Sequence, residues 1–316
     1  MPRIIFLFFC ACTDNISTDL PDTTIGEADT DTDTDTDTDT DTDTDTDTDS
    51  DTDTDTDTDT EPAEDYRVPG PYSVVSSSES SQLDTGCSAS YILHTPSGAA
   101  DGPVVVLGHG FARGTAQMEG WAEHFASWGI TSAALSMCSF SDHEANGADM
   151  VALGTLLDSG AGVLYAGHSA GGLSAVVAGA SDADALGVVG LDLTDASDVG
   201  LAAADRISVP VYGIVGEPSA CNSDGNGVDV YARADVDALR VNSADHCDFE
   251  NETDFLCELL CPDGGGDSAA IQATVRGLAT AALVELAGLG DGIDGWWVSG
   301  GTYHDSLSSS GAISRP

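Results

Sequence analysis

A serine flanked by glycines lies at the centre of the segment LYAGHSAGG, which covers residues 164–172. Ser169 stands between Gly167 and Gly171 in the spacing Gly-x-Ser-x-Gly. This spacing is typical of a sharp turn from a strand into a helix, where the serine hydroxyl rises above the sheet and the glycines remove colliding side chains. Because the chain holds 36 glycines, the pattern needs support from its context before Ser169 is interpreted as a nucleophile.

A serine nucleophile needs a base to accept its proton, and this base is usually histidine. His246 follows the last expected strand, in the segment NSADHCDFE, and is the favoured candidate. His143 lies in a loop before the nucleophile and is the weaker competitor. The remaining histidines are expected to serve packing, the surface or the two glycine turns: His94, His124, His304, His109 and His168.

The acid that orients the imidazole should lie between Ser169 and His246 in the sequence. Asp192 is favoured, because it stands at the end of an expected strand, where a side chain is held rigidly. Glu217, after the next strand, and Asp195 remain as alternatives. Each of these carboxylates could instead cap a helix or lie solvated in a loop.

An oxyanion formed during acyl transfer needs hydrogen-bond donors that are already in place. The segment GHGF, at residues 108–111, follows another expected strand. We expect the backbone N–H groups of Phe111 and Ala170 to form the oxyanion hole. These residues together predict acyl transfer through an acyl-enzyme on Ser169, with no cofactor required.

The elements that must position these residues alternate between strands and helices. Two strands are expected first, within 72–80 and 88–96, and buried strands within 102–110, 130–138, 162–169, 185–195, 209–217 and 237–249. Helices are expected within 115–129, 147–160, 170–180 and 269–289. The buried strands read as continuous apolar runs, which predicts an α/β fold with a mostly parallel sheet covered by helices on both faces.

Five segments, in this order, resemble the α/β-hydrolase family, in the branch of chlorophyllases, bacterial polyester hydrolases and platelet-activating-factor acetylhydrolases: VVVLGHGF, HFASWGI, GHSAGG, GLDLTD and ADHCDF. The resemblance implies an α/β-hydrolase fold and a catalytic triad of Ser169, His246 and Asp192. In chlorophyllases and the acetylhydrolases the acid follows the strand after the nucleophile helix, as Asp192 does. In the polyester hydrolases it comes one strand later, where this chain has Glu217 and no aspartate.

We therefore expect an exported serine hydrolase that cleaves small or polymeric carboxylic esters and works as a monomer. The alternative is a catalytically silent α/β-hydrolase scaffold, displayed at the cell surface for adhesion or cation binding. The net charge of −47 makes nucleic acid and anionic lipid headgroups poor partners.

The chain is expected to divide into a signal peptide at 1–12, a disordered tether at 13–65 and a catalytic domain at 66–316. The signal resembles that of a bacterial lipoprotein, with Ala11 before a lipid-bearing Cys12, and this predicts an extracellular or cell-surface location. The tether contains sixteen Asp-Thr or Asp-Ser dipeptides between Asp29 and Thr60, which have no apolar side chains to bury. It could be a solvated spacer, a weak calcium binder or a carrier of O-glycans.

The six cysteines that follow the signal favour disulfides, as is usual in exported chains. Fifteen pairings are formally open. The expected ones are Cys221–Cys247, Cys257–Cys261 and, by elimination, Cys87–Cys138. The segment CNSDGNGVDV, at residues 221–230, has the alternating oxygen side chains of a calcium loop but lacks the terminal glutamate of an EF-hand, so a polar turn is the other interpretation.

Overall fold

The structure, a computed structural model, describes residues 63–99, 101–236, 238–261, 266 and 268–316. The expected signal peptide with Cys12, and residues 13–62 of the expected tether, lie outside the described residues.

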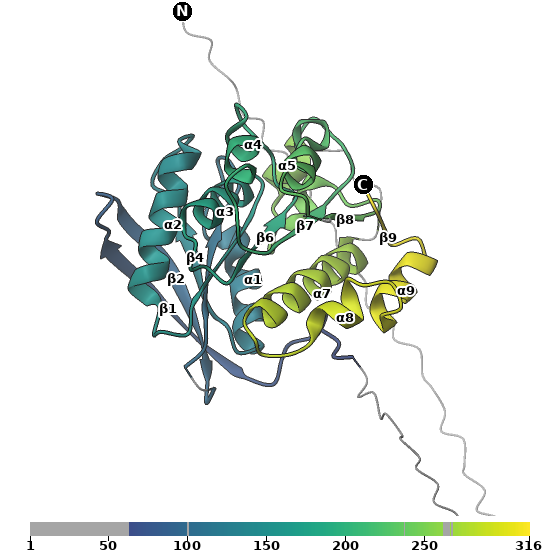
Figure 1. The fold of residues 1–316 in the computed structure, drawn as a ribbon, viewed down its shortest axis with the longest axis horizontal. Helices are drawn as coiled ribbons and strands as arrows, with labels where there is room; N and C mark the ends of the chain where they lie inside the picture. Colours follow the sequence, from purple (N-terminus) through teal and green to yellow (C-terminus); the bar gives the residue numbers. More distant parts are fainter. Residues whose placement is uncertain (1–62, 100, 237, 262–265, 267) are drawn as a thin grey trace, which may run out of the picture. The chain divides into compact units, whose positions relative to one another are not determined.

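Nine strands of the described residues form one mixed sheet in the order β1-β2-β4-β3-β5-β6-β7-β8-β9 (Figure 1). The strands are β1 (Ser73–Gln82), β2 (Ser88–Ser97), β3 (Val104–Gly108), β4 (Thr131–Ser136), β5 (Val163–His168), β6 (Gly187–Leu191), β7 (Val211–Val215), β8 (Ala238–Val241) and β9 (Ile313–Ser314). Strands β3 to β8 pair in parallel, whereas β1, β2 and β9 join the sheet by antiparallel pairing. The prediction of a mostly parallel α/β sheet is therefore confirmed.

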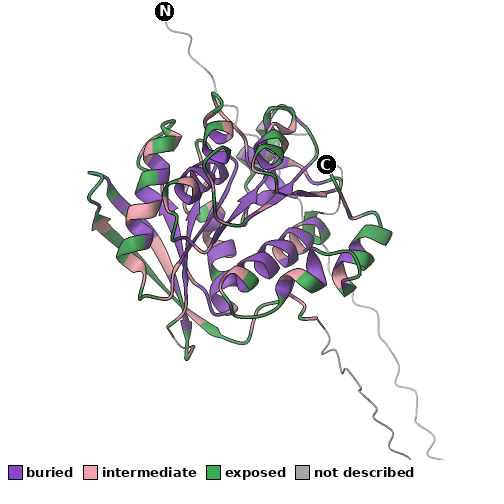
Figure 2. Cartoon of the chain, viewed as in Figure 1, coloured by how far each residue is buried: buried purple, intermediate pink, exposed green. Residues whose placement is uncertain are grey.

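Helices cover both faces of this sheet (Figure 1). They are α1 (Ala116–Ser127), α2 (His143–Leu157), α3 (Ala170–Ser181), α4 (Val199–Ala204), α5 (Gly227–Arg233), α6 (Phe255–Leu260), α7 (Ser268–Leu286), α8 (Gly292–Trp296) and α9 (Thr302–Ser309). Apolar residues of α1, α7 and α8 form a core on one face, and those of α2, α3, α4 and α5 form a core on the other. Figure 2 shows buried residues along the strands and on the inner sides of these helices.

The apolar runs of the central strands follow from burial on both faces. In β3, Val105 and Leu107 belong to the core beneath α1 and α7, while Val104 and Val106 belong to the core beneath α2 and α3. Successive side chains of a strand point to opposite faces, so a strand between two helical layers needs an apolar residue at each position. Helix α7 is long and apolar enough to cross a bilayer, but it is mostly buried in the first of these cores.

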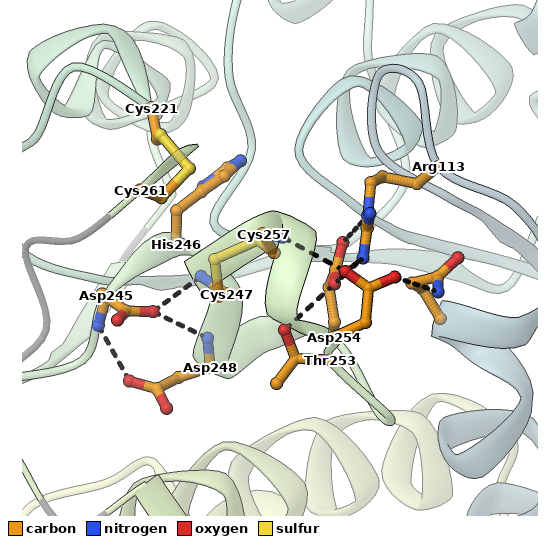
Figure 3. The surroundings of a disulfide bond; sticks show 12 residues. Arg113, Cys221, Asp245, His246, Cys247, Asp248, Thr253, Asp254, Cys257 and Cys261 are labelled. Atoms are coloured by element: carbon orange, nitrogen blue, oxygen red, sulfur yellow. Dashed lines mark hydrogen bonds and ion pairs between the residues drawn. A yellow bond between two sulfur atoms is a disulfide. The ribbon is translucent and has the colours of Figure 1, made fainter. Parts of the chain in front are cut away.

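Three disulfides join described residues: Cys87–Cys138, Cys221–Cys261 and Cys247–Cys257. The first pairing confirms the prediction. The predicted Cys221–Cys247 and Cys257–Cys261 bonds are wrong. Cys257 lies in α6 and Cys261 directly follows this helix, with the Cys261 N–H donating to the Cys257 carbonyl, so both side chains leave the same side of this segment. Cys247, in the segment 246–249, and Cys221, after β7, lie across from that side, and each bonds to one of the two cysteines (Figure 3).

Candidate active site

Ser169 occupies a sharp turn between β5 and α3. Its backbone has φ 56° and ψ −120°, a conformation that non-glycine residues rarely adopt and that costs about 1–3 kcal/mol. The surrounding packing keeps the chain there. A Cβ on Gly171 would collide with the carbonyl oxygen of Gly108, and one on Gly167 would lie 2.5 Å from the Gly171 carbonyl oxygen. The two glycines thus allow the start of α3 to pack directly against the ends of β3 and β5.

Asp192 and His246 form a short hydrogen bond at the same edge of the sheet. Asp192 follows β6, and His246 begins a short 3-10 helix, His246–Phe249, after β8. The His246 Nδ1 atom lies 2.6 Å from the Asp192 Oδ2 atom, and both side chains are buried. Since an ionised carboxylate only accepts, it holds the imidazole with the proton on Nδ1 and leaves Nε2 free to accept another.

The other carboxylate oxygen of Asp192 is fixed by the loop after β7. Its Oδ1 atom accepts a hydrogen bond of 2.9 Å from the Gly216 N–H. The Asn222 amide donates to both carboxylate oxygens, at 3.3 Å to Oδ1 and 3.1 Å to Oδ2. Sequence reasoning placed Asn222 only in a candidate calcium loop or polar turn. One feature of the sequence indicates that Asn222 lies near the site: it follows Cys221 in a loop at the carboxyl ends of the strands.

The Ser169 turn lies directly beside this pair. The Ser169 N–H donates to the carbonyl of Leu191, the residue before Asp192, at 3.0 Å. The ring of His168 packs against the ring of His246, with 4.4 Å between their centroids. Among the hydrogen bonds of the described residues, none joins the Ser169 hydroxyl to the His246 ring. Hydrogen bonds between nucleophile and base are often long in free enzymes and shorten when substrate binds.

The two expected oxyanion donors border one small cleft. Phe111 and Ala170 both line a cleft of about 230 Å³ beside the Ser169 turn. A Cβ on Gly110 would lie 3.4 Å from the Ser169 Cβ, so the Gly110 turn contacts the Ser169 turn closely. Within the described part of the chain, neither the Phe111 nor the Ala170 backbone N–H donates to a protein acceptor. Neither donor is therefore occupied by another group of the described residues, as an oxyanion hole requires.

The alternative acids make other contacts. Glu217 accepts from the Ser243 N–H at 3.1 Å and is exposed. Asp195 accepts from the Gly200 N–H at 2.7 Å, in the first turn of α4. Of the three candidate carboxylates, the structure brings Asp192 to His246.

The alternative base, His143, starts α2 and lines the same cleft as Phe111. Burial lowers its pKa. Two further histidines lie beside the site. His109 fixes the Gly110 turn, because its Nδ1 donates to the Gly110 carbonyl at 2.9 Å and its Nε2 accepts from the Met137 N–H at 3.1 Å. His168 is fully buried, and burial holds its pKa well below the usual value.

The other histidines lie away from these contacts. His94 in β2 and His124 in α1 are buried, the first beside the Ser76 hydroxyl at 2.8 Å and the second donating to the Tyr66 carbonyl at 2.9 Å. His304 in α9 lies 3.1 Å from Asp305. These contacts agree with a packing role.

Searches against protein-family models and against curated protein sequences find no match to this chain.

Proposed function

We propose that this chain is a serine hydrolase that cleaves carboxylic esters on an α/β-hydrolase fold. The hydrogen bond of 2.6 Å between Asp192 and His246, next to the strained turn of Ser169, carries the proposal. A buried acid–imidazole pair beside a serine at a sheet edge is the arrangement that activates a serine nucleophile.

The order of the elements supports this fold. The antiparallel strands β1 and β2 come first in the chain, and the parallel strands β3 to β8 follow. Strands β3 and β5 are neighbours near the middle of the sheet. Ser169 follows β5, Asp192 follows β6 and His246 follows β8. In a parallel sheet the carboxyl ends of the strands share one edge, which is where ligands bind in open α/β folds.

The mechanism follows from the roles of these groups. The Ser169 hydroxyl attacks the ester carbonyl while the His246 Nε2 accepts its proton, and Asp192 stabilises the resulting imidazolium. The negative oxygen of the tetrahedral intermediate accepts hydrogen bonds from the backbone N–H groups of Phe111 and Ala170. His246 then gives its proton to the leaving alcohol, and water releases the acyl group from Ser169 by the same steps. The nucleophile, the base, the acid and both oxyanion donors of this mechanism are thus residues of this chain.

The three disulfides are compatible with an extracellular protein, because disulfides persist in oxidising compartments. Export by the 1–12 segment and lipidation of Cys12 remain predictions.

Hydrolysis of p-nitrophenyl esters of increasing acyl length tests the proposal. The wild type should release p-nitrophenol, and Ser169→Ala should lower kcat by about 10⁴-fold or more, with only the residual rate that the oxyanion hole and substrate binding provide. Ser181→Ala, at the other end of α3, is the matched control, since its hydroxyl donates to the Val177 carbonyl within the helix. Folded wild-type protein that hydrolyses none of the esters would favour the silent scaffold instead.

A further inference from the structure

A buried ion pair beside the site has no part in the mechanism above. Arg113 and Glu250 are 137 residues apart in sequence and make two parallel hydrogen bonds, with Nε to Oε1 at 2.6 Å and Nη2 to Oε2 at 2.7 Å. The Glu250 side chain is 0% exposed and that of Arg113 is 11% exposed. Such a bidentate pair fixes the orientation of both side chains as well as their distance.

The pair joins two loops that carry different parts of the proposed machinery. Arg113 ends the turn that begins at Gly110, with its N–H donating to the Gly110 carbonyl at 3.1 Å, and Phe111 lies within that turn. Glu250 closes the 3-10 helix that starts at His246, and its N–H donates to the Cys247 carbonyl at 3.1 Å. One loop supplies an oxyanion donor and the other supplies the base.

The ion pair also lies beside the turn that carries Ser169, which is called the nucleophile turn below. The Glu250 Oε1 atom lies 3.9 Å from Nδ1 of His168, the residue before Ser169. A Cβ on Gly110 would lie 3.2 Å from that same His168 nitrogen. The Glu250 carboxylate thus lies where three segments meet: the oxyanion turn (110–113), the nucleophile turn and the base loop (246–250).

The charges show why a cation is needed here. A buried carboxylate requires a counter-charge, and burial lowers the pKa of His168 and disfavours a charge on its ring, which lies 3.9 Å away. Arg113 does, and its Nη2 also lies 2.9 Å from Asp254, which precedes α6 (Figure 3). The disulfide Cys247–Cys257 joins the same base loop to α6. Arg113 therefore connects the oxyanion turn to a segment that is also crosslinked covalently to Cys247, the residue after His246.

We propose that Arg113 and Glu250 are positioning residues, which hold the oxyanion turn of Phe111 and the base loop of His246 at their working distance. This inference rests on the proposed function. Misplacement of reacting groups by about 1 Å can cost about 10²-fold in rate, so weakening the pair should act on the chemical step and leave substrate binding largely unchanged.

The test uses three variants: Glu250→Gln, Arg113→Lys and the double variant that carries both changes. Asp205→Asn is the matched control. Asp205 makes the same kind of bidentate pair with Arg233, but that pair is exposed and lies at the ends of α4 and α5. Glu250→Gln keeps the shape of the side chain, and Arg113→Lys keeps the charge but loses the two parallel donors. Ester hydrolysis gives kcat and KM, and amide hydrogen exchange gives the opening of segments 109–113 and 246–250.

We expect Glu250→Gln to lower kcat about 10²-fold with KM changed less than about threefold. The double variant should lose no more than the worse single variant, since the two residues act as a unit. Exchange should rise in both segments together, and Asp205→Asn should change none of these quantities. Unchanged kcat in folded Glu250→Gln, additive losses, or faster exchange in one segment alone would overturn the proposal.

Failure of the proposed function gives a different result. If the wild type hydrolyses no ester and yet Glu250→Gln raises exchange in both segments, the coupling of the loops stands and the esterase assignment falls. If exchange is unchanged in both segments, the coupling falls whatever the activity of the wild type.

Discussion

Replacing Asp192 by asparagine should disable the base while leaving the fold intact. In the native protein, Asp192 accepts from the Gly216 N–H, from the Asn222 amide and from the His246 Nδ1–H group. Asparagine has one accepting oxygen and one donating NH₂ group. Turning the oxygen toward His246 would leave the buried Gly216 donor facing NH₂, at a cost of about 1–3 kcal/mol. The oxygen should therefore face Gly216, and the NH₂ group should face the imidazole.

That orientation forces the wrong tautomer on His246. Nδ1 must then accept, so Nε2 carries the proton and cannot take one from Ser169. In a serine protease the equivalent change lowers kcat about 10⁴-fold, which corresponds to about 5.5 kcal/mol of transition-state stabilisation. We expect a loss of that order in ester hydrolysis for Asp192→Asn.

The assay is kcat for p-nitrophenyl acetate, with the melting temperature measured in parallel. Glu217→Gln is the control, because the Glu217 carboxylate accepts from the Ser243 N–H on the exposed side of the loop. It should keep kcat within about twofold of the wild type, as expected for an exposed side chain outside the site. A folded Asp192→Asn protein within tenfold of wild-type kcat would refute the reasoning, as would an equal loss in Glu217→Gln.

Three further predictions concern stability. Gly171→Ala should lower the free energy of unfolding by about 3 kcal/mol, because its Cβ meets backbone, whereas Gly114→Ala, with its nearest neighbour at 3.8 Å, should change it by less than about 0.5 kcal/mol. Replacing Cys221 and Cys261 together by alanine should cost about 4 kcal/mol, from the sequence separation of 40 residues. Burial lowers the pKa of His124 from 6.5 to about 4, so the unfolded state binds a proton first as pH falls, and about 3 kcal/mol of stability should be lost between pH 6.5 and 4.

Denaturant unfolding checks all three. Equal effects of the two glycine substitutions would contradict the packing of α3 against β3. Peptides from non-reduced protein that link Cys221 to Cys247 would contradict the pairing. His124→Gln should flatten the fall in stability between pH 6.5 and 4, and an unchanged slope would contradict the assignment to His124. Burial also lowers the pKa values of His94, His109, His143 and His168, and these groups add losses of the same sign. The slope of the variant is therefore compared with that of the wild type.

The α/β class was predictable because the local signals were strong. Runs such as Val104–Gly108 and Val163–His168 have the uniform apolar pattern that two-sided burial demands. Strand β9 was not predicted, because it has two residues and depends on pairing with β8. Helices α4, α5, α6, α8 and α9 were missed for a similar reason, since short helices owe their stability to tertiary packing.

The sequence predicted those residues of the candidate site that directly follow a strand. Asp192 and His246 each follow a strand of one parallel sheet, which places both at the same edge. The contacts that fix these residues join segments far apart in the chain. Asn222 bonds to Asp192 across 30 residues, and Arg113 bonds to Glu250 across 137. Sequence spacing carries no signal for such pairs, and closeness in sequence likewise gave the wrong partner for Cys257 and Cys261.

The central claim is that Ser169 is a nucleophile activated by His246, and covalent labelling with a fluorophosphonate tests it most directly. Peptide mass mapping should place the phosphonyl group on Ser169 in the wild type. Ser169→Ala should take up no label, and labelling of His246→Ala should be slower by at least about 10³-fold. Folded wild-type protein that stays unlabelled, or that carries the label on another serine, would contradict the account.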